Sequence, residues 1–184
     1  MKCFSIVYQH DSMLCGVACL KMICKYFGRE YSSDSLSKLC FATTEGVSML
    51  GINETAKTLG IETVCAKATP KELCETPLPC ILHWNQNHFV VLYKVKKGKK
   101  FYVADPGKGK TTYNLEDFKQ HWISTRANGE DKGIAMFFET TPAFFTYQME
   151  GEENKKEQRS FKFLLGYFKK YRKAFSWIVL GLLM

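Results

Sequence analysis

The order of sequence patterns along the chain predicts an α+β fold, with amino-terminal helices packed on a mostly antiparallel β-sheet. Between residues 13 and 60, apolar side chains recur at three- and four-residue steps, which is typical of helices with one buried face. From Ile61 onward the runs are short and rich in β-branched and aromatic residues. Two of them, residues 88–95 and 100–104, are separated by a turn at residues 97–99, which predicts a hairpin.

The first predicted helix spans residues 13–27. Asp11 or Ser12 can supply its N-cap, and Gly28 stands where a left-handed residue commonly follows a helix. The apolar residues that predict its buried face are Leu14, Val17, Ala18, Met22 and Tyr26.

Three cysteines lie in this helix, and the first of them is the candidate nucleophile. Cys15 falls in the first turn, where unpaired N–H groups and the positive end of the helix dipole favour an ionised thiol. We interpret Cys19 and Cys24 as small buried hydrophobic residues. Gln9, outside the helix, carries an amide that can donate to a negative oxygen forming beside the Cys15 sulfur.

Each later helix is predicted from a capping residue. These helices begin after Ser32, after Ser48, at Thr69-Pro70 and after Asn114. The helix after Ser48 ends at Gly60 and is expected to bury Leu50, Ile52, Ala56 and Leu59. The strands and apolar runs are expected at residues 61–66, 80–84, 88–95, 100–104 and 133–139.

Charge and cysteine usage exclude several classes of function. The net charge is +8, but the residues from Gly151 onward carry eight Lys or Arg against three Glu. The globular part is therefore nearly balanced, which argues against a nucleic-acid partner. The eight cysteines include no C-x-x-C pair, so no metal site is predicted, and the amino terminus does not read as a signal peptide. We interpret the thiols as reduced and facing the cytosol.

The carboxy-terminal part differs in composition from the rest. We expect one globular domain at residues 1–145 and a charged linker at residues 146–160. Residues 161–184 combine a basic cluster with an apolar run that is still rising at Met184. Two interpretations remain open: a buried terminal helix, or an interfacial helix leading into a truncated transmembrane segment, which we favour.

Two further residues can be assembled around Cys15. His88 opens the first hairpin strand after a polar break, and Asp105 closes the second. On antiparallel neighbours joined by a short turn, these positions lie close together. A carboxylate there can accept from one imidazole nitrogen while the other nitrogen faces the thiol. The sequence therefore predicts a Cys-His-Asp arrangement. His83 is expected in the sheet, whereas no partner is predicted for His10 or His121.

These motifs together resemble the papain-like cysteine peptidase domain at the amino terminus of ATP-binding-cassette exporters of bacteriocins and other peptides. Members of this family cut leader peptides behind a double-glycine motif. The resemblance covers roughly residues 5–140, and the matching stretches are Gln9, Cys15 to Leu20, Pro79 to Leu92, Asp105-Pro106 and Trp122. One departure is Leu14, where the family commonly has an acidic residue.

The resemblance implies a role for each candidate residue. Cys15 would be the nucleophile, His88 the base, Asp105 the orienting residue and Gln9 the oxyanion donor. The implied fold is papain-like, and the implied location is the cytoplasmic face of the inner (plasma) membrane. The peptidase itself would need no cofactor, whereas ATP would serve an absent transporter part. The implied partners are a leader peptide, the protein's own transmembrane and nucleotide-binding domains, and a second copy in a homodimer.

Three alternatives to these interpretations are less consistent with the residues. A non-catalytic leader-docking module would not need all four catalytic residue types. A Cys-His-Asp acyltransferase would use the same triad, but the upstream glutamine and the exporter-like tail argue against it. Residues 104–111 nearly match a phosphate-binding loop, but Ala104 replaces the first glycine and Pro106 lacks a backbone donor.

Overall fold

A computed structural model describes residues 4–43, 46–127 and 129–147. Its helices are a 3₁₀ turn (η1, Ser12–Leu14), α1 (Cys15–Tyr26), α2 (Ser33–Leu39), α3 (Met49–Thr58), α4 (Pro70–Glu75), α5 (Leu115–Trp122) and α6 (Pro142–Thr146). Its strands are β1 (Ile61–Ala68), β2 (Cys80–Trp84), β3 (His88–Lys96), β4 (Lys100–Asp105), β5 (Gly109–Asn114), β6 (Ile123–Ala127) and β7 (Glu130–Thr140).

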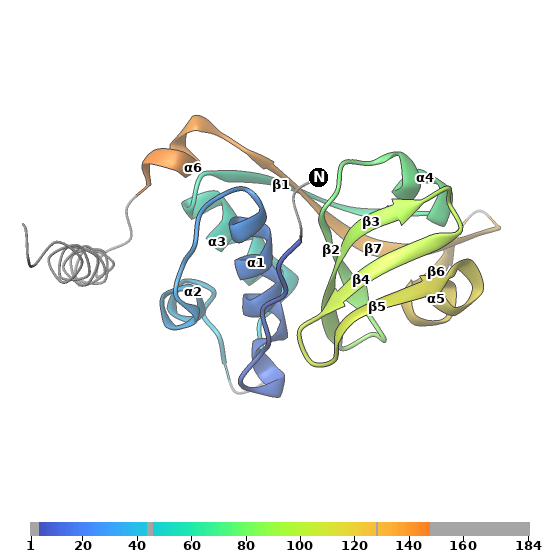
Figure 1. Ribbon diagram of the computed structural model, residues 1–184, viewed down its shortest axis with the longest axis horizontal. Coiled ribbons are helices and arrows are strands. Elements are labelled where there is room, and N and C mark those ends of the chain that lie inside the picture. Colours follow the sequence, from blue (N-terminus) through green and yellow to red (C-terminus); the bar gives the residue numbers. More distant parts are fainter. Residues whose placement is uncertain (1–3, 44–45, 128, 148–184) are drawn as a thin grey trace, which may run out of the picture. The chain divides into compact units, whose positions relative to one another are not determined.

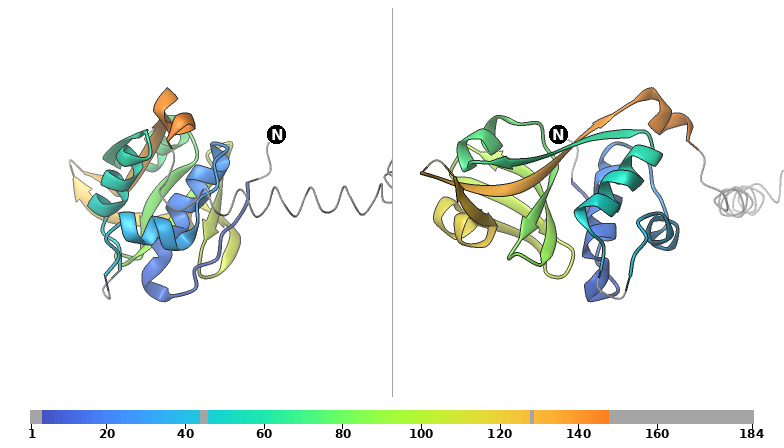
Figure 2. Two further views of the ribbon diagram at one scale, coloured as in Figure 1. Left: turned by 90° about the vertical axis from the view of Figure 1, so that its left-hand side faces the viewer. Right: turned by 180° about the vertical axis from the view of Figure 1, so that it is seen from behind.

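The strands form one seven-stranded sheet in the order β1-β7-β2-β3-β4-β5, with β6 paired to β7. Every pairing is antiparallel. Helices α1, α2 and α3 gather on one side of the domain and β2 to β5 on the other, while the long strands β1 and β7 run between the two (Figure 1). The view from behind in Figure 2 shows the same division. The α+β prediction is therefore confirmed.

Strand β3 is covered on both faces, which explains its continuous apolar run. Its residues 89–92 are all buried. Val90 and Leu92 join the main core cluster with Phe118 and Trp122 of α5. The neighbouring Phe89 instead meets α1, because its carbonyl accepts a hydrogen bond from the Cys19 thiol at 3.3 Å. A strand buried on both faces is hydrophobic along its whole length rather than alternating.

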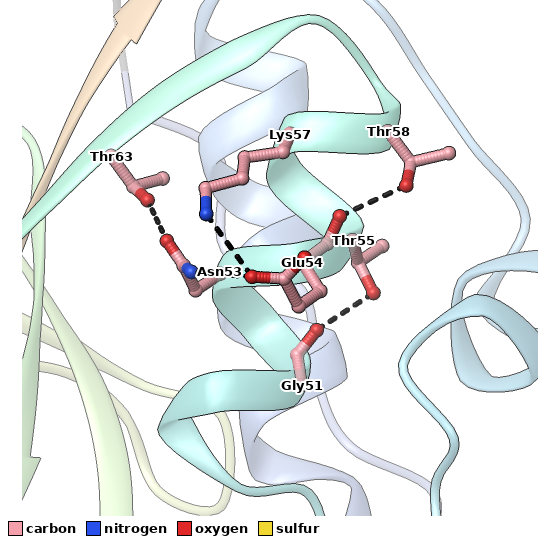
Figure 3. A network of polar contacts seen from close by, with 7 residues as sticks. All are labelled: Gly51, Asn53, Glu54, Thr55, Lys57, Thr58 and Thr63. Carbon is pink, nitrogen blue, oxygen red and sulfur yellow. Dashed lines mark hydrogen bonds and ion pairs between the residues drawn. The ribbon is translucent and has the colours of Figure 1, made fainter.

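Helix α3 is tied to the edge strand β1 by polar contacts as well as by packing. The Thr63 hydroxyl of β1 donates to the Asn53 side chain of α3 (Figure 3). Lys57 and Glu54 form an ion pair at 3.1 Å on the exposed side of the same helix. Thr55, which is buried, satisfies its hydroxyl on the Gly51 carbonyl at 2.8 Å. The Thr63–Asn53 hydrogen bond therefore joins the helix to the strand, whereas the other two contacts lie within the helix.

Most of the predicted caps are confirmed. The Asp11 carboxylate accepts from the backbone N–H of Met13 at 3.1 Å and so caps the turn that leads into α1. Ser32, Ser48 and Asn114 each cap a helix through the side-chain oxygen. At α4, Thr69 and Glu72 form a reciprocal capping box. Gly28 and Gly60 follow their helices at φ values of +101° and +80°.

Several predictions were wrong or incomplete. Leu50 was expected on the buried face of α3 but is 67% exposed, because it lies in the first turn on the side opposite Ile52. The strands β5 and β6 and the helix α6 were not predicted. Strand β5 is an edge strand with few apolar residues, and only alternate residues are turned inward. Strand β7 begins three residues before the predicted start at Gly133 and lies inside the sheet, between β1 and β2.

The rejected phosphate-binding loop is the turn between β4 and β5, with the adjoining ends of both strands. Lys110 and Thr111 lie in β5, paired with Ala104 and Val103 of β4, rather than at the start of a helix. The predicted linker (146–160) and interfacial helix (161–184) lie outside the described residues from Gln148 onward. Within the described ranges, every helix is too short or too polar to cross a bilayer.

Candidate active site

Cys15 is the first residue of α1, where the helix begins from the turn capped by Asp11. Its backbone therefore contributes to the positive helix end, which stabilises a thiolate. The residue is buried to 7% exposure. The sequence placed this cysteine correctly because the cap and the apolar period are both local signals.

Gly16 lets α1 approach the sheet closely at this point. A Cβ atom on Gly16 would lie 3.0 Å from Ile52 Cδ1 and 3.3 Å from Phe89 Cδ2. Because Phe89 directly follows His88, the same close approach brings the start of α1 against the start of β3. Helix packing thus sets the separation between Cys15 and His88.

His88 and Asp105 are paired as the hairpin predicted. The imidazole Nε2 lies 2.9 Å from Asp105 Oδ1. Asp105 is 3% exposed, and its carboxylate also accepts from the backbone N–H of Gly107 at 2.8 Å. With Nε2 engaged, Nδ1 is the ring nitrogen left for the thiol. Burial raises the pKa of Asp105, but the hydrogen bonds from His88 and Gly107 outweigh it and lower the pKa overall.

The electrostatics of Cys15 and His88 favour an ion pair. Burial raises the pKa of the Cys15 thiol, but the hydrogen bond from His88 and the backbone bonds from Phe89 and Gly16 lower it overall. Burial likewise lowers the pKa of His88, yet its bonds to Asp105 and Cys15 raise that pKa to about 9. A lowered thiol pKa beside a raised imidazole pKa favours the thiolate–imidazolium pair over the neutral thiol and imidazole.

Gln9 reaches this site from the amino-terminal arm, which we define as residues 4–9. Its backbone N–H donates to the Pro106 carbonyl at 3.0 Å. Its side-chain amide lies beside Gly107, since a Cβ on that glycine would be 3.8 Å from Gln9 Nε2. The side-chain amide oxygen of Gln9, Oε1, is buried and has no hydrogen-bond partner among the described residues. The turn at residues 105–107 therefore carries Asp105, the acid that pairs with His88, and also contacts Gln9.

The other cysteines of α1 differ from Cys15 in environment. Cys19 is fully buried, and burial together with the neighbouring Cys15 raises its pKa well above the ordinary value. Burial raises the pKa of Cys24 as well. Both are the buried hydrophobic residues that the sequence predicted. A thiol that stays protonated donates a hydrogen bond, as Cys19 does to the Phe89 carbonyl.

Some contacts near the site were not predicted. His121, for which no partner was expected, donates from Nδ1 to Asn85 Oδ1 at 2.8 Å and stacks on Trp84. This hydrogen bond joins His121 to the turn that precedes His88, in which Asn85 and Gln86 have positive φ values. The backbone of Phe89 also bonds both cysteines that face it. Such contacts join distant parts of the chain, so no local sequence pattern predicts them.

Comparison with known proteins shows which family the chain resembles. The family model for the peptidase C39 family matches residues 3–127. The lactococcin-G-processing and transport ATP-binding protein LagD of Lactococcus lactis is 38% identical over 123 residues, which are 64% of this chain and 17% of that protein. The probable microcin-H47 secretion/processing ATP-binding protein MchF of Escherichia coli is 34% identical over 117 residues, with the same two shares. The chain thus spans less than a fifth of these relatives.

Solved structures share the fold. A double-glycine motif protease from an AMS/PCAT transporter, solved with its leader peptide, superposes with a TM-score of 0.66 at 30% identity, covering 74% of this chain and 91% of that chain. The peptidase domain of Streptococcus ComA, a bi-functional ABC transporter, gives a TM-score of 0.63 at 27% identity, covering 75% and 99%. Both are domains in which helices pack on an antiparallel sheet, so the papain-like fold predicted from the sequence is confirmed.

Proposed function

This chain belongs to the peptidase C39 family, and from that premise we propose that it is a cysteine endopeptidase that removes double-glycine leaders from exported peptides. One observation carries the proposal. His88 is held at 2.9 Å by the buried Asp105, and Cys15, at the first position of α1, has a pKa lowered mainly by its hydrogen bond with that histidine. This is the arrangement that activates a thiol for attack on a carbonyl.

The reaction follows from these groups. The Cys15 thiolate attacks the carbonyl carbon of the residue before the cut, and a tetrahedral oxyanion forms. The Gln9 amide and the backbone N–H of Cys15 donate to that oxygen. The His88 imidazolium then gives its proton to the leaving amine, which departs and leaves a thioester on Cys15. Water, deprotonated by His88, hydrolyses the thioester and regenerates the thiol.

Asp105 acts through His88 in this scheme. Its carboxylate accepts from Nε2, which fixes the ring orientation and leaves Nδ1 toward the thiol. The Gly107 N–H, bonded to the same carboxylate oxygen, keeps the acid ionised and in place. The His88–Asp105 pair beside Cys15 favours an enzyme over a module that only docks leaders.

The names of the relatives support the wider assignment. LagD is described as processing and transporting lactococcin G, and a related solved domain was crystallised with a leader peptide. We propose that this chain is the corresponding cytosolic part of a peptide exporter. Its partners would be a leader peptide, the exporter's own transmembrane and ATP-binding domains, and a second copy of the exporter.

Synthetic leader peptides test the proposal with the full 184-residue chain. A peptide ending its leader in Gly-Gly should be cut after the second glycine, as judged by mass spectrometry. Valine at either glycine should block cleavage, because a cleft shaped for glycine clashes with added bulk. The valine peptides should still bind Cys15→Ala protein, because apolar residues upstream supply the affinity.

Each outcome of this experiment is informative. If no leader is cut although it binds, the chain is a docking module. If valine peptides are cut as fast as glycine peptides, the enzyme is a cysteine peptidase but the double-glycine specificity is wrong. If an acyl group is transferred to an amine faster than to water, the acyltransferase alternative is correct.

A further inference from the structure

We propose that Phe4 and Lys110 are positioning residues for Gln9, anchoring the amino-terminal arm so that the amide reaches the oxyanion. The inference rests on the proposed role of Gln9. Neither anchor residue belongs to the Cys15, His88 and Asp105 arrangement. Both act through the arm, which carries no helix or strand of its own between Phe4 and Gln9.

Phe4 fixes the start of the arm by aromatic packing. Its ring stacks on Tyr93 of β3, with centroids 4.8 Å apart and planes 6° from parallel. It also meets Tyr26 at the end of α1, at a centroid distance of 6.0 Å. Phe4 is only 6% exposed, although it lies near the chain terminus. Offset aromatic pairs of this kind contribute beyond the area they bury.

Lys110 fixes the same point by a charge-assisted hydrogen bond. Its ammonium donates to the Phe4 carbonyl at 2.5 Å. The same ammonium lies 5.8 Å from the centroid of the Tyr93 ring, so the aromatic face contributes a cation–π attraction. Lys110 thus joins the arm, β3 and β5 at one point. A hydrogen bond from a charged ammonium to a backbone carbonyl is stronger than one between neutral groups.

The far end of the arm is held at the active-site turn. The Gln9 N–H donates to the Pro106 carbonyl at 3.0 Å. Tyr8 approaches β5, since a Cβ on Gly109 would lie 3.4 Å from the tyrosine hydroxyl. Backbone hydrogen bonds of a helix or sheet would hold a catalytic residue without help. Gln9 lacks such support, so its position depends on the anchors at the two ends of the arm.

A loosened arm should affect one step of the reaction. If Gln9 is in place only a fraction of the time, the rate of acylation falls to that fraction of its full value. Removing an oxyanion donor outright typically costs ~10²–10³ in kcat. Loss of one anchor should therefore cost about 10-fold, leaving KM and the reactivity of Cys15 nearly unchanged because the arm acts on the transition state.

A double-mutant cycle separates positioning from general destabilisation. Phe4→Ala, Gln9→Ala and the double variant are compared for kcat and KM on one leader peptide. Phe4→Ala should lower kcat about 10-fold in the parent but have no further effect in the Gln9→Ala background. Lys110→Met should behave like Phe4→Ala, and Lys110→Arg should restore the rate because it keeps a donor. Phe145→Ala, at a 60% exposed ring of α6, is the matched control.

The results distinguish failure of this inference from failure of the proposed function. If Gln9→Ala itself leaves kcat unchanged, Gln9 is not the oxyanion donor. If Gln9→Ala slows cleavage but Phe4→Ala slows the parent and the Gln9→Ala variant equally, Phe4 is merely structural and the inference is wrong. Unchanged kcat in both Phe4→Ala and Lys110→Met would overturn it as well. The alkylation rate of Cys15 checks that the variants keep the nucleophile intact.

Discussion

The two sides of the candidate site are built by different forces. On the helical side, Cys15 is placed by packing: a Cβ added to Gly16 would lie only 3.0–3.4 Å from side-chain atoms of three other segments. On the sheet side, His88 and Asp105 are placed by hydrogen bonds of 2.9 and 2.8 Å. The helical side thus determines how far the thiol lies from the base. The sheet side determines the charge and orientation of that base.

This difference means that the two sides should fail in different ways. A change on the sheet side alters protonation and therefore the pH dependence of the rate. A change on the helical side alters packing and therefore the free energy of unfolding as well as the rate. Variants chosen from each side can separate the two contributions.

The largest effect is expected from Cys15→Ala, which removes the nucleophile. Cleavage of the leader peptide should fall at least ~10³-fold while binding is retained. Cys19→Ala, one turn along α1, is the matched control and should keep most of the activity, because Cys19 donates only to the Phe89 carbonyl. Discontinuous peptide assays and fluorescence binding measure the two properties. If Cys19→Ala lost activity and Cys15→Ala did not, the assignment of Cys15 as the nucleophile would be wrong.

Asp105→Asn should cost about 100-fold in kcat and move the alkaline limb of the pH profile. The parent enzyme should lose activity as pH rises through about 9, where His88 loses the proton that it gives to the leaving amine. Without the carboxylate charge, the pKa of His88 falls toward its ordinary value of 6.5, so the same loss occurs at lower pH. Asp131→Asn, at an exposed ion pair, is the control. If the alkaline limb of the pH profile does not shift in Asp105→Asn, Asp105 does not raise the pKa of His88.

Selective alkylation tests the charge that the two sides create together. At pH 6, iodoacetamide should label Cys15 at least ~10-fold faster than the exposed Cys65 and Cys74, because its lowered pKa gives Cys15 the larger thiolate fraction. Burial raises the pKa of both exposed thiols, whereas the His88 contact lowers that of Cys15. Peptide mapping gives the rates, and His88→Ala should abolish the preference. Earlier labelling of Cys65 or Cys74 would show that Cys15 is not an activated thiol.

The elements predicted from the sequence are those that local chemistry determines. Helix α1 has a capping residue, an apolar residue at every third or fourth position, and a glycine at its end. The β3–β4 hairpin has a clear turn sequence. These local signals are enough to predict that Cys15, His88 and Asp105 lie close together. The pairing of His88 with Asp105 followed from that hairpin. The Cys15 side required only the helix start.

What could not be predicted depends on contacts between distant residues. Strand β5 is polar and becomes a strand only because β4 offers it an edge. The His121–Asn85 bond joins residues 36 positions apart, and the Lys110 contact with Phe4 spans 106 positions. Leu50 was misassigned because helical period alone does not say which residues of a first turn the neighbours cover. The roles of the four candidate residues stay a prediction.

Gly16→Ala should give a small effect, and it tests the packing side directly. An added methyl would lie 3.0 Å from Ile52 Cδ1 and 3.3 Å from Phe89 Cδ2, both closer than ordinary contact, and 3.4 Å from Val47 Cβ. Alanine favours a helix over glycine by up to ~1 kcal/mol, but overpacking a core costs ~1–3 kcal/mol. The free energy of unfolding should therefore fall by about 1 kcal/mol, measured as a lower urea midpoint at unchanged m-value.

The counterpart on the sheet side is Gly107→Ala. Its Cβ would meet Asp105 Oδ1 at 3.4 Å and Gln9 atoms at 3.8 Å, which is ordinary contact, and its φ is not left-handed. We expect a stability change within about 0.5 kcal/mol. The shifted helix of Gly16→Ala should also separate Cys15 from His88 and weaken the bond that lowers the thiol pKa. Alkylation of Cys15 should then need a higher pH in Gly16→Ala than in Gly107→Ala. If Gly16→Ala is as stable as the parent, packing does not set the distance between the two sides.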